Sequence, residues 1–187
     1  SACLVGSEMC IRDSVISDLE AGKLMDRLIC GDVGFGKTEV ALRASFIVAN
    51  AGYQVALVAP TTILTKQNYN SFYERFKNSS LKVSSLSRMT IASKRKIIKN
   101  NLKSGEINII VGTHALLSND IDFNNLGLLI IDEEQHFGVA QKEKIKELQG
   151  NIHVLTLTAT PIPRTLQLSL SGLKQLSLIS TPPVDRL

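Results

Sequence analysis

Short apolar runs alternate with longer amphipathic stretches along most of this 187-residue chain. Each run is a nearly continuous series of Val, Ile and Leu that ends in Gly, Asp, Pro or Thr, which is the pattern of strands covered on both faces. Strands that alternate with helices predict an α/β fold, a mostly parallel sheet with helices on both faces. We expect strands at Arg27–Cys30, Gln54–Ala59, Lys82–Leu86, Ile107–Val111, Leu126–Ile131 and His153–Thr158. We expect helices at Thr38–Asn50, Ile63–Lys77, Ala92–Lys103, Val139–Gln149 and Thr165–Leu170.

The positive charge of the chain is concentrated in one segment. The formal net charge is +4, from 21 Lys and Arg against 17 Asp and Glu. Residues 61–105 hold ten of the basic residues and one acid, Glu74, so this segment carries +9 and the remainder carries −5. Such a segment predicts contact with a polyanion. The alternative is that these lysines form the solvated faces of two helices.

Composition excludes several classes of protein. Apolar residues make up 44% of the chain, which is enough for a core and unlike a disordered or collagen-like chain. The longest apolar runs are too short to span a bilayer, and no signal peptide opens the sequence. The three cysteines lack metal-ligand spacing, so reduced thiols are the simplest interpretation. We therefore expect a soluble cytoplasmic domain that makes no membrane contact.

The segment after the first predicted strand has the spacing G-x-x-x-x-G-K-[ST] and leads into a predicted helix. Its glycines let the backbone wrap around phosphates, so that N–H groups and the positive end of the helix face the anion. Lys37 is then expected to reach the β and γ phosphates of ATP, and the Thr38 hydroxyl to ligate Mg²⁺. An ordinary glycine-rich turn is the alternative. The predicted nucleotide-binding residues are Gly31, Asp32, Val33, Gly34, Phe35, Gly36, Lys37 and Thr38.

Three carboxylates, Asp132, Glu133 and Glu134, directly follow the apolar run that ends at Ile131. Acids at the end of a buried strand are costly unless a cation or a proton compensates them. Beside a phosphate loop, Asp132 is predicted to bind Mg²⁺, partly through a water molecule, and Glu133 to polarise the attacking water. A solvated helix start is the alternative, and it suits Glu134 better than Asp132.

The order of these motifs resembles that of a known superfamily. Residues 31–38 resemble motif I of superfamily 2 helicases and translocases, residues 132–135 resemble motif II, and residues 158–160 resemble motif III. Residues 60–62 and 112–114 resemble motifs Ia and Ib of the same superfamily. Within the superfamily, Met25–Ala41 and Thr158–Thr165 look like the bacterial transcription-repair coupling factors (Mfd), with RecG-type helicases as the nearest sibling. Phe35 and Glu39 in the loop, and Asp-Glu-Glu-Gln at 132–135, favour the coupling factors.

This resemblance implies a RecA-like P-loop lobe, the first motor lobe of an ATP-driven translocase on double-stranded DNA in the bacterial cytoplasm. The complete protein would act on stalled RNA polymerase and recruit excision-repair proteins. Lys37, Glu133 and Gln135 would be catalytic, with ATP and Mg²⁺ as cofactors, while Gln135, Thr158 and Thr160 would couple the γ-phosphate to DNA and to a second lobe. The residues that would contact DNA, largely at its phosphates, are Thr61, Thr62, Arg88, Gly112, Thr113 and His114. Helix caps, strand ends or plain surface positions are the alternatives for these threonines and the histidine.

The sequence departs from the family pattern at both ends. Family members carry a Gln and an aromatic residue ahead of the phosphate loop for adenine recognition, whereas here the first Gln is Gln54 and the first aromatic residue is Phe35. We expect residues 1–14 to be a non-matching tract, an artefact or truncation scar, and residues 15–187 to form the lobe. Residues 173–187 predict a last strand and an exposed turn, beyond which a second RecA-like lobe is expected. Without the arginines of that lobe, the isolated chain should hydrolyse ATP weakly.

Two other functions remain open at this point. One is the lobe of a RecG-like helicase that moves branched DNA, and native flanking sequence would distinguish it. The other is a nucleotide-dependent switch that binds a protein and never DNA, against which the basic segment 61–105 argues. Within that segment, the spacing of Lys94, Arg95 and Lys96 suits an exposed helix face.

Overall fold

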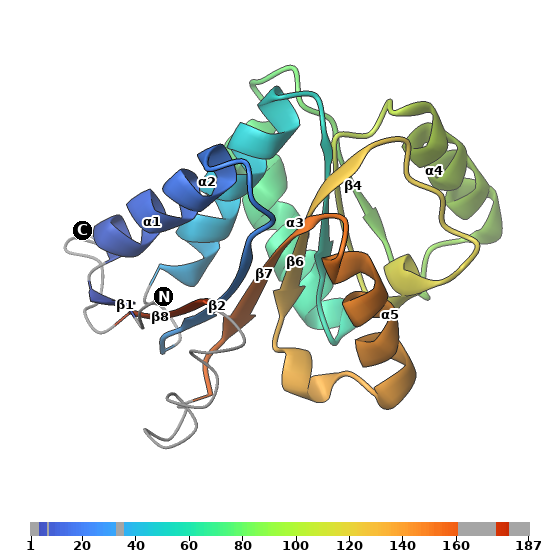
Figure 1. The fold of residues 1–187 in the computed structure, drawn as a ribbon. Helices are drawn as coiled ribbons and strands as arrows, with labels where there is room; N and C mark the ends of the chain where they lie inside the picture. Colours follow the sequence, from blue (N-terminus) through green and yellow to red (C-terminus); the bar gives the residue numbers. More distant parts are fainter. Residues whose placement is uncertain (1–3, 7, 33–35, 161–174, 180–187) are drawn as a thin grey trace.

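The computed structural model describes residues 4–6, 8–32, 36–160 and 175–179. Within these ranges eight strands form one all-parallel sheet in the order β1-β8-β2-β7-β6-β3-β5-β4 (Figure 1). The strands are β1 (Leu4–Gly6), β2 (Asp26–Cys30), β3 (Gln54–Val58), β4 (Val83–Leu86), β5 (Ile109–Gly112), β6 (Leu126–Asp132), β7 (His153–Thr158) and β8 (Gln175–Ile179). The helices are α1 (Glu8–Glu20), α2 (Lys37–Asn50), α3 (Thr62–Phe76), α4 (Ala92–Ser104) and α5 (Val139–Gln149), with 3₁₀ turns η1 (His114–Leu117) and η2 (Glu134–His136).

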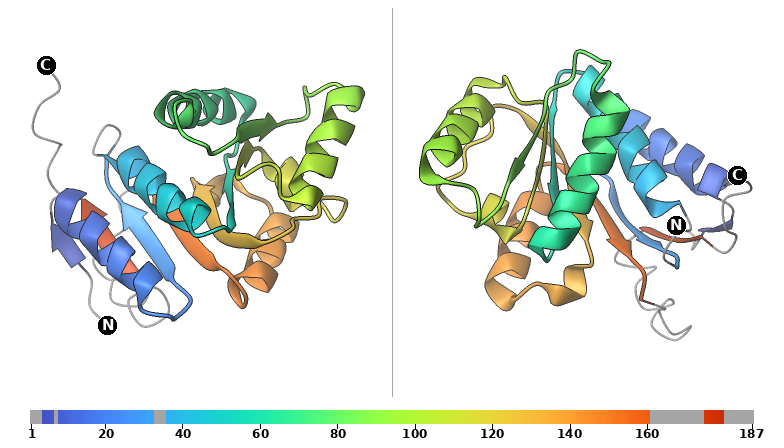
Figure 2. Two further views of the ribbon diagram at one scale, coloured as in Figure 1. Left: turned by 90° about the horizontal axis from the view of Figure 1, so that it is seen from above. Right: turned by 180° about the vertical axis from the view of Figure 1, so that it is seen from behind.

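Helices cover both faces of the sheet, and each face has its own apolar core (Figure 2). On one face α1, α2 and α3 contribute buried side chains that include Val15, Val48 and Phe72. On the other face α4 and α5 contribute Ile98 and Ile145. Alternate residues of the central strands belong to the two cores because successive side chains of a strand point to opposite faces. This is the doubly covered α/β arrangement that the apolar runs predict.

Most of the predicted elements are confirmed, and the differences have clear causes. The strand predicted at Lys82–Leu86 is present as β4, but the prediction that it is buried on both faces is wrong. β4 is an edge strand whose first three residues are half-buried. The last predicted strand is confirmed as β8, whereas the helix expected at Thr165–Leu170 lies outside the described residues. None of the helices in the described ranges is long and apolar enough to cross a membrane.

The sequence analysis did not anticipate α1, and a buried ion pair holds this helix against the sheet. Arg27 on β2 is 3% exposed, and its guanidinium lies 2.6 Å from the Asp18 carboxylate of α1. The same guanidinium donates a hydrogen bond of 2.6 Å to the Ser177 hydroxyl of β8. A buried cation needs such partners, so Arg27 joins α1, β2 and β8. The predicted boundary between residues 14 and 15 falls inside α1, next to the buried Val15.

Candidate functional site

The loops that carry the predicted motifs lie in a row at the carboxyl edge of the sheet. Strands β2, β7, β6, β3 and β5 are neighbours in that order and are all parallel, so their carboxyl ends share one edge. The row begins at Gly31 and continues with Thr158, Asp132, Thr61 and Gly112. The backbone N–H of Gly31 donates to the carbonyl of Thr158 at 3.2 Å, which joins the first two loops. Four strand spacings, about 19 Å in all, separate the two ends of the row.

The phosphate loop leads directly into α2, and Lys37 lies against the start of that loop. Gly36 has φ 86°, in the left-handed region that glycine occupies without strain. The Lys37 ammonium donates to the carbonyl of Asp32 at 2.7 Å and to the carbonyl of Gly31. Burial lowers the pKa of Lys37, against the opposing effect of nearby carboxylates. The Thr38 side chain is exposed in the first turn of α2, and predicted loop residues 33–35 lie outside the described ranges.

Asp132 ends β6 as a partly buried carboxylate, and one side chain from α3 contacts it. The amide nitrogen of Asn68 donates a hydrogen bond of 3.1 Å to Asp132 Oδ2. Burial raises the pKa of Asp132; the Asn68 hydrogen bond lowers it, and the neighbouring Glu133 raises it further. The sequence analysis missed Asn68. Its place seven residues after Thr61, on the same face of the expected helix, is the signal that could have pointed to it.

Glu133 has an unusual backbone conformation. It has φ 55° and ψ 58°, and no other non-glycine residue within the described ranges has a positive φ. A side chain in this region costs free energy, and such residues cluster at functional sites. Its carboxylate accepts hydrogen bonds from the backbone N–H of Ala159 at 2.8 Å, the hydroxyl of Thr158 at 3.1 Å and the amide of Gln135. The strained backbone therefore directs Glu133 towards the carboxyl end of β7.

A continuous hydrogen-bond network joins the predicted motifs II and III. The Gln135 amide also donates to the hydroxyl of Thr160 at 3.0 Å. The backbone N–H of Thr160 in turn donates to the Thr158 hydroxyl at 3.1 Å, and that hydroxyl donates to Glu133. These four side chains, predicted from separate motifs, therefore meet in one network. A shift of the segment after β7 would reach Glu133 through these bonds.

The side chains at this edge fit a magnesium ion better than a metal held by protein alone. In the part of the chain that the structure describes, no group of three or more His, Cys, Asp and Glu could hold a metal. Mg²⁺ takes most of its ligands from phosphates and water, with one or two from the protein. One hydroxyl, Thr38, and one partly buried carboxylate, Asp132, are a donor set of that kind.

The predicted DNA-contacting residues at or just after the ends of β3 and β5 also have local structural roles. Thr61 caps α3, since its hydroxyl accepts a hydrogen bond of 3.2 Å from the backbone N–H three residues on, and Thr62 next to it is exposed. Thr113 is 3% exposed, and its hydroxyl accepts a hydrogen bond from the backbone of η1. Gly112 is buried where a Cβ atom would lie 2.4 Å from the backbone oxygen of Leu86. Of these groups, Thr61 and Thr62 present side chains to solvent.

Arg88 and His114 lie together beyond the ends of β4 and β5. The Arg88 guanidinium nitrogen Nη2 is 2.6 Å from Nε2 of His114. Burial and the adjacent guanidinium lower the pKa of His114, so the imidazole is neutral near pH 7 and accepts the hydrogen bond. The pair brings an exposed cation next to the predicted motif Ib.

Ion pairs narrow the positive surface of residues 61–105. Five of its ten cations are paired with acids, as Arg75–Glu39, Lys77–Glu74, Lys82–Glu106, Lys99–Asp120 and Lys103–Asp122. The other five have no ion pair within the described structure: Lys66, Arg88, Lys94, Arg95 and Lys96. Exposed ion pairs contribute little to stability, but they reduce the local field. The surplus charge therefore concentrates near Arg88 and the start of α4.

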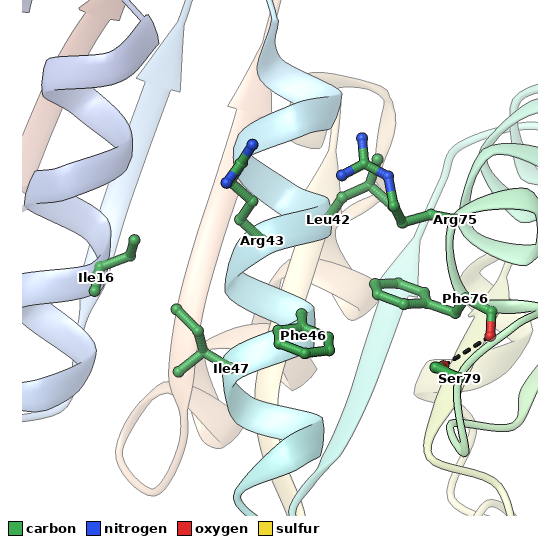
Figure 3. Close-up of a pocket in the computed structure, with 8 residues that line it drawn as sticks. All are labelled: Ile16, Leu42, Arg43, Phe46, Ile47, Arg75, Phe76 and Ser79. Carbon is green, nitrogen blue, oxygen red and sulfur yellow. Dashed lines mark hydrogen bonds between the residues drawn. The ribbon is translucent and has the colours of Figure 1, made fainter.

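A separate apolar groove of about 330 Å³ lies between α1, α2 and α3 (Figure 3). Its lining residues are Ile16, Leu42, Arg43, Phe46, Ile47, Arg75, Phe76 and Ser79. The groove is lined by residues of the helices, and those on α2 lie nearer the C-terminus of that helix than the phosphate loop does. Phosphate sites are built from backbone N–H groups and a few cations rather than from apolar walls. The strand-end loops, and not this groove, are therefore the candidate nucleotide site.

Comparison with known proteins agrees with this geometry. Residues 10–169 match the family model described as DEAD/DEAH box helicase. The chain belongs to the DEAD/DEAH box helicase family. Membership of the DEAD/DEAH box family implies that this chain binds a nucleotide.

Individual relatives refine the comparison within the DEAD/DEAH box family. The chain is 56% identical over 180 residues to the transcription-repair-coupling factor of Haemophilus influenzae, an alignment that covers 96% of this chain and 16% of that protein. It is 50% identical over 175 residues to the transcription-repair-coupling factor of Escherichia coli, covering 94% of this chain and 15% of that protein. The resemblance to coupling factors is confirmed, and the chain spans about a sixth of these relatives.

Solved structures match the fold. RecG bound to a three-way DNA junction superposes with a TM-score of 0.82 at 35% identity, covering 100% of this chain and 25% of that chain. The Hef helicase domain of Pyrococcus furiosus superposes with a TM-score of 0.67 at 20% identity, covering 92% and 38%. The RecA-like fold is therefore confirmed, and so is the prediction of RecG as a relative.

Proposed function

We propose that this chain is the first motor lobe of an ATP-driven translocase on double-stranded DNA, of the transcription-repair coupling type. The observation that carries this proposal is the network around Glu133, which joins motifs II and III beside Lys37 and Asp132. Identities of 56% and 50% to coupling factors, against 35% to RecG, favour coupling over branch migration.

In this proposal the loop after β2 binds the phosphates of ATP, and the end of β6 contributes to the metal site and to hydrolysis. Lys37 leaves the carbonyls of the loop and binds the β and γ phosphates, and the backbone N–H groups at the start of α2 bind the same anion. Thr38 and Asp132 would hold Mg²⁺, Asp132 partly through a water molecule. When bound, Mg²⁺ neutralises charge that develops on the β and γ phosphate oxygens.

Glu133 orients the attacking water and accepts its proton as the water oxygen bonds to the γ-phosphorus, while the bond from that phosphorus to the β–γ bridging oxygen breaks and ADP leaves with its electron pair. Its three hydrogen-bond donors fix the direction of the carboxylate, so little reorganisation is needed at that step. Gln135, Thr158 and Thr160 pass changes at the γ-phosphate to a second RecA-like lobe, which supplies the catalytic arginines. The 187-residue chain by itself is expected to bind nucleotide but to hydrolyse it slowly, since loss of such an arginine costs roughly 10³–10⁵ in rate.

Double-stranded DNA is the proposed polymer at the other end of the row. Exposed Thr61 and Thr62 contact its phosphates directly, and Arg88 with His114 adds a positive group nearby. Gly112 and Thr113 shape the turn that carries His114. Stalled RNA polymerase and excision-repair proteins are proposed partners of the intact protein.

The test uses the intact protein, wild type and Lys37→Ala, in assays of ATP binding and DNA-stimulated hydrolysis. Lys37→Ala should abolish both, while Lys146→Ala, an exposed lysine on α5, should match the wild type. DNA binding should weaken steeply as salt rises, because phosphate contacts release counterions. Wild-type ATP binding with no salt-dependent DNA binding would favour the protein-binding switch and refute the translocase.

A further inference from the structure

Along its length, helix α3 connects the proposed DNA end of the row of loops, the carboxylate of Asp132 and the first turn of α2. Its N-terminal cap, Thr61, lies at the proposed DNA end of the row. In its second turn Asn68 donates to Asp132, and in its last turn the Arg75 guanidinium pairs with Glu39 in the first turn of α2. No other helix in the described ranges contacts Asp132 through a side-chain hydrogen bond. The DNA end, the metal-binding carboxylate and the nucleotide helix therefore share one element.

The first two of these contacts lie on a single face of α3. Thr61, Thr65 and Asn68 have the spacing i, i+4, i+7, which places them in one line along the helix. The Thr61 carbonyl accepts hydrogen bonds from both the backbone N–H of Thr65, at 3.0 Å, and its hydroxyl, at 2.9 Å. Thr65 is 3% exposed, so this junction is shielded from water. The line spans about 10 Å of helix.

Packing anchors the C-terminal part of α3 against the core and against α2. Phe72 is fully buried and Phe76 is 3% exposed, and their rings pack edge to face with centroids 6.0 Å apart. Phe76 also stacks on Phe46 of α2 at 6.2 Å. In Figure 3 these two rings face each other below Arg75 of α3 and Arg43 of α2. Between Thr61 and Asn68 the chain forms about two unbroken turns of this anchored helix, and these turns connect Thr61 to Asn68.

We propose that Asn68 is a positioning residue for Asp132, and that α3 couples DNA contact at Thr61 to the metal site through this hydrogen bond. The proposal rests on the function proposed above and names a route for its regulation. The amide holds Oδ2 of Asp132, which fixes the rotation of the carboxylate and directs the other oxygen to the metal.

The chemistry of asparagine suits this role. Its amide donates a hydrogen bond without adding charge, so the negative charge of Asp132 stays available to Mg²⁺. A lysine or arginine at the same place would pair with the carboxylate and compete with the metal. A hydrogen bond to a metal-binding carboxylate typically changes metal affinity by about 10–100-fold when it is removed.

The experiment measures nucleotide binding, independently of turnover, as Mg²⁺ is titrated into the intact protein. Asn68→Leu keeps the size of the side chain and removes the donor, and Asn68→Ala serves if the leucine variant fails to fold. The Mg²⁺ concentration for half-maximal binding of a fluorescent ATP analogue should rise about 10-fold. Binding of the same analogue in EDTA should be unchanged, because Lys37 and its loop are intact. The stimulation of hydrolysis by DNA should also fall.

The matched control is Asn70→Leu, an exposed asparagine two residues further along α3. It should reproduce the wild-type Mg²⁺ titration and the wild-type stimulation by DNA. A titration with Asn68→Leu equal to that with Asn70→Leu would overturn the proposal. Failure of the wild type to bind nucleotide at all would instead refute the function proposed above, so the two failures are distinguishable.

Discussion

Replacing Glu133 by glutamine isolates the step assigned to its carboxylate. The change keeps the shape of the side chain but leaves one oxygen where there were two. In the wild type, Ala159 donates to one oxygen, and Thr158 and Gln135 both donate to the other. If glutamine keeps its oxygen facing Ala159, its NH₂ group faces the NH₂ group of Gln135, so at least that hydrogen bond is lost.

The size of each effect follows from these contacts. A hydrogen bond to a charged group contributes about 1.5–3 kcal/mol, so the free energy of unfolding should fall by roughly that amount. Loss of the proton acceptor should slow hydrolysis by roughly 10²–10⁴, which corresponds to about 3–5 kcal/mol in the activation free energy. A typical domain retains enough stability to stay folded after the first loss. The variant should therefore bind ATP and hold it without turning it over.

The assay follows a single turnover of bound ATP in the intact protein, with nucleotide affinity and thermal unfolding measured on the same samples. Glu134→Gln, the neighbouring carboxylate in η2, is the control and should hydrolyse ATP close to the wild-type rate. Hydrolysis by Glu133→Gln at the wild-type rate would refute the role of Glu133. Loss of ATP binding together with hydrolysis would show that the network holds the loop rather than the attacking water.

Two further changes test the burial of groups at the same edge of the sheet. Because burial raises the pKa of Asp132, its ionised form destabilises the ligand-free fold, an effect that is absent below the ordinary value of 3.8 and grows as pH rises through the folded pKa. Asp132→Asn should therefore have a higher Tm than the wild type at neutral pH, and the difference in Tm should disappear in acid. The same variant should not hydrolyse ATP. An unchanged or lower Tm at neutral pH would contradict the pKa shift. Gly112→Ala would place a Cβ atom 2.4 Å from a backbone oxygen and 2.7 Å from Leu116, which should cost about 1–3 kcal/mol in urea unfolding. Gly150→Ala, with no atom within 4 Å and φ −70°, should cost nothing, and equal stabilities for the two alanine variants would refute the steric argument.

Features that depend on neighbouring residues could be predicted from the sequence. The phosphate loop is recognisable because its glycines and Lys37 act within eight consecutive residues between a strand and a helix. The central strands are recognisable because burial on both faces requires continuous apolar runs, as in β6. The burial of β4 was predicted wrongly because a strand with two serines is stable when one of its faces is covered.

Contacts between distant residues could not be predicted in this way. Asn68 and Asp132 are 64 positions apart, and Arg27 and Ser177 are 150 apart. Helix α1 was missed because its apolar residues gather only weakly on one face, and its attachment depends on the buried Arg27–Asp18 pair. The left-handed backbone of Glu133 also has no signal in its residue type, since glutamate rarely adopts that conformation.

The sequence by itself determined the family, the fold class and the residues that can perform phosphate chemistry, because motif spacing and apolar periodicity are local properties of the chain. The tertiary structure decided how those residues act on one another. Parallel strands carry their ends to one edge, so motifs more than a hundred residues apart become neighbours, as Gly31 and Thr158 do. The hydrogen bonds of Glu133 and the line from Thr61 to Asp132 arise from that closeness, which depends on the order of strands in the sheet.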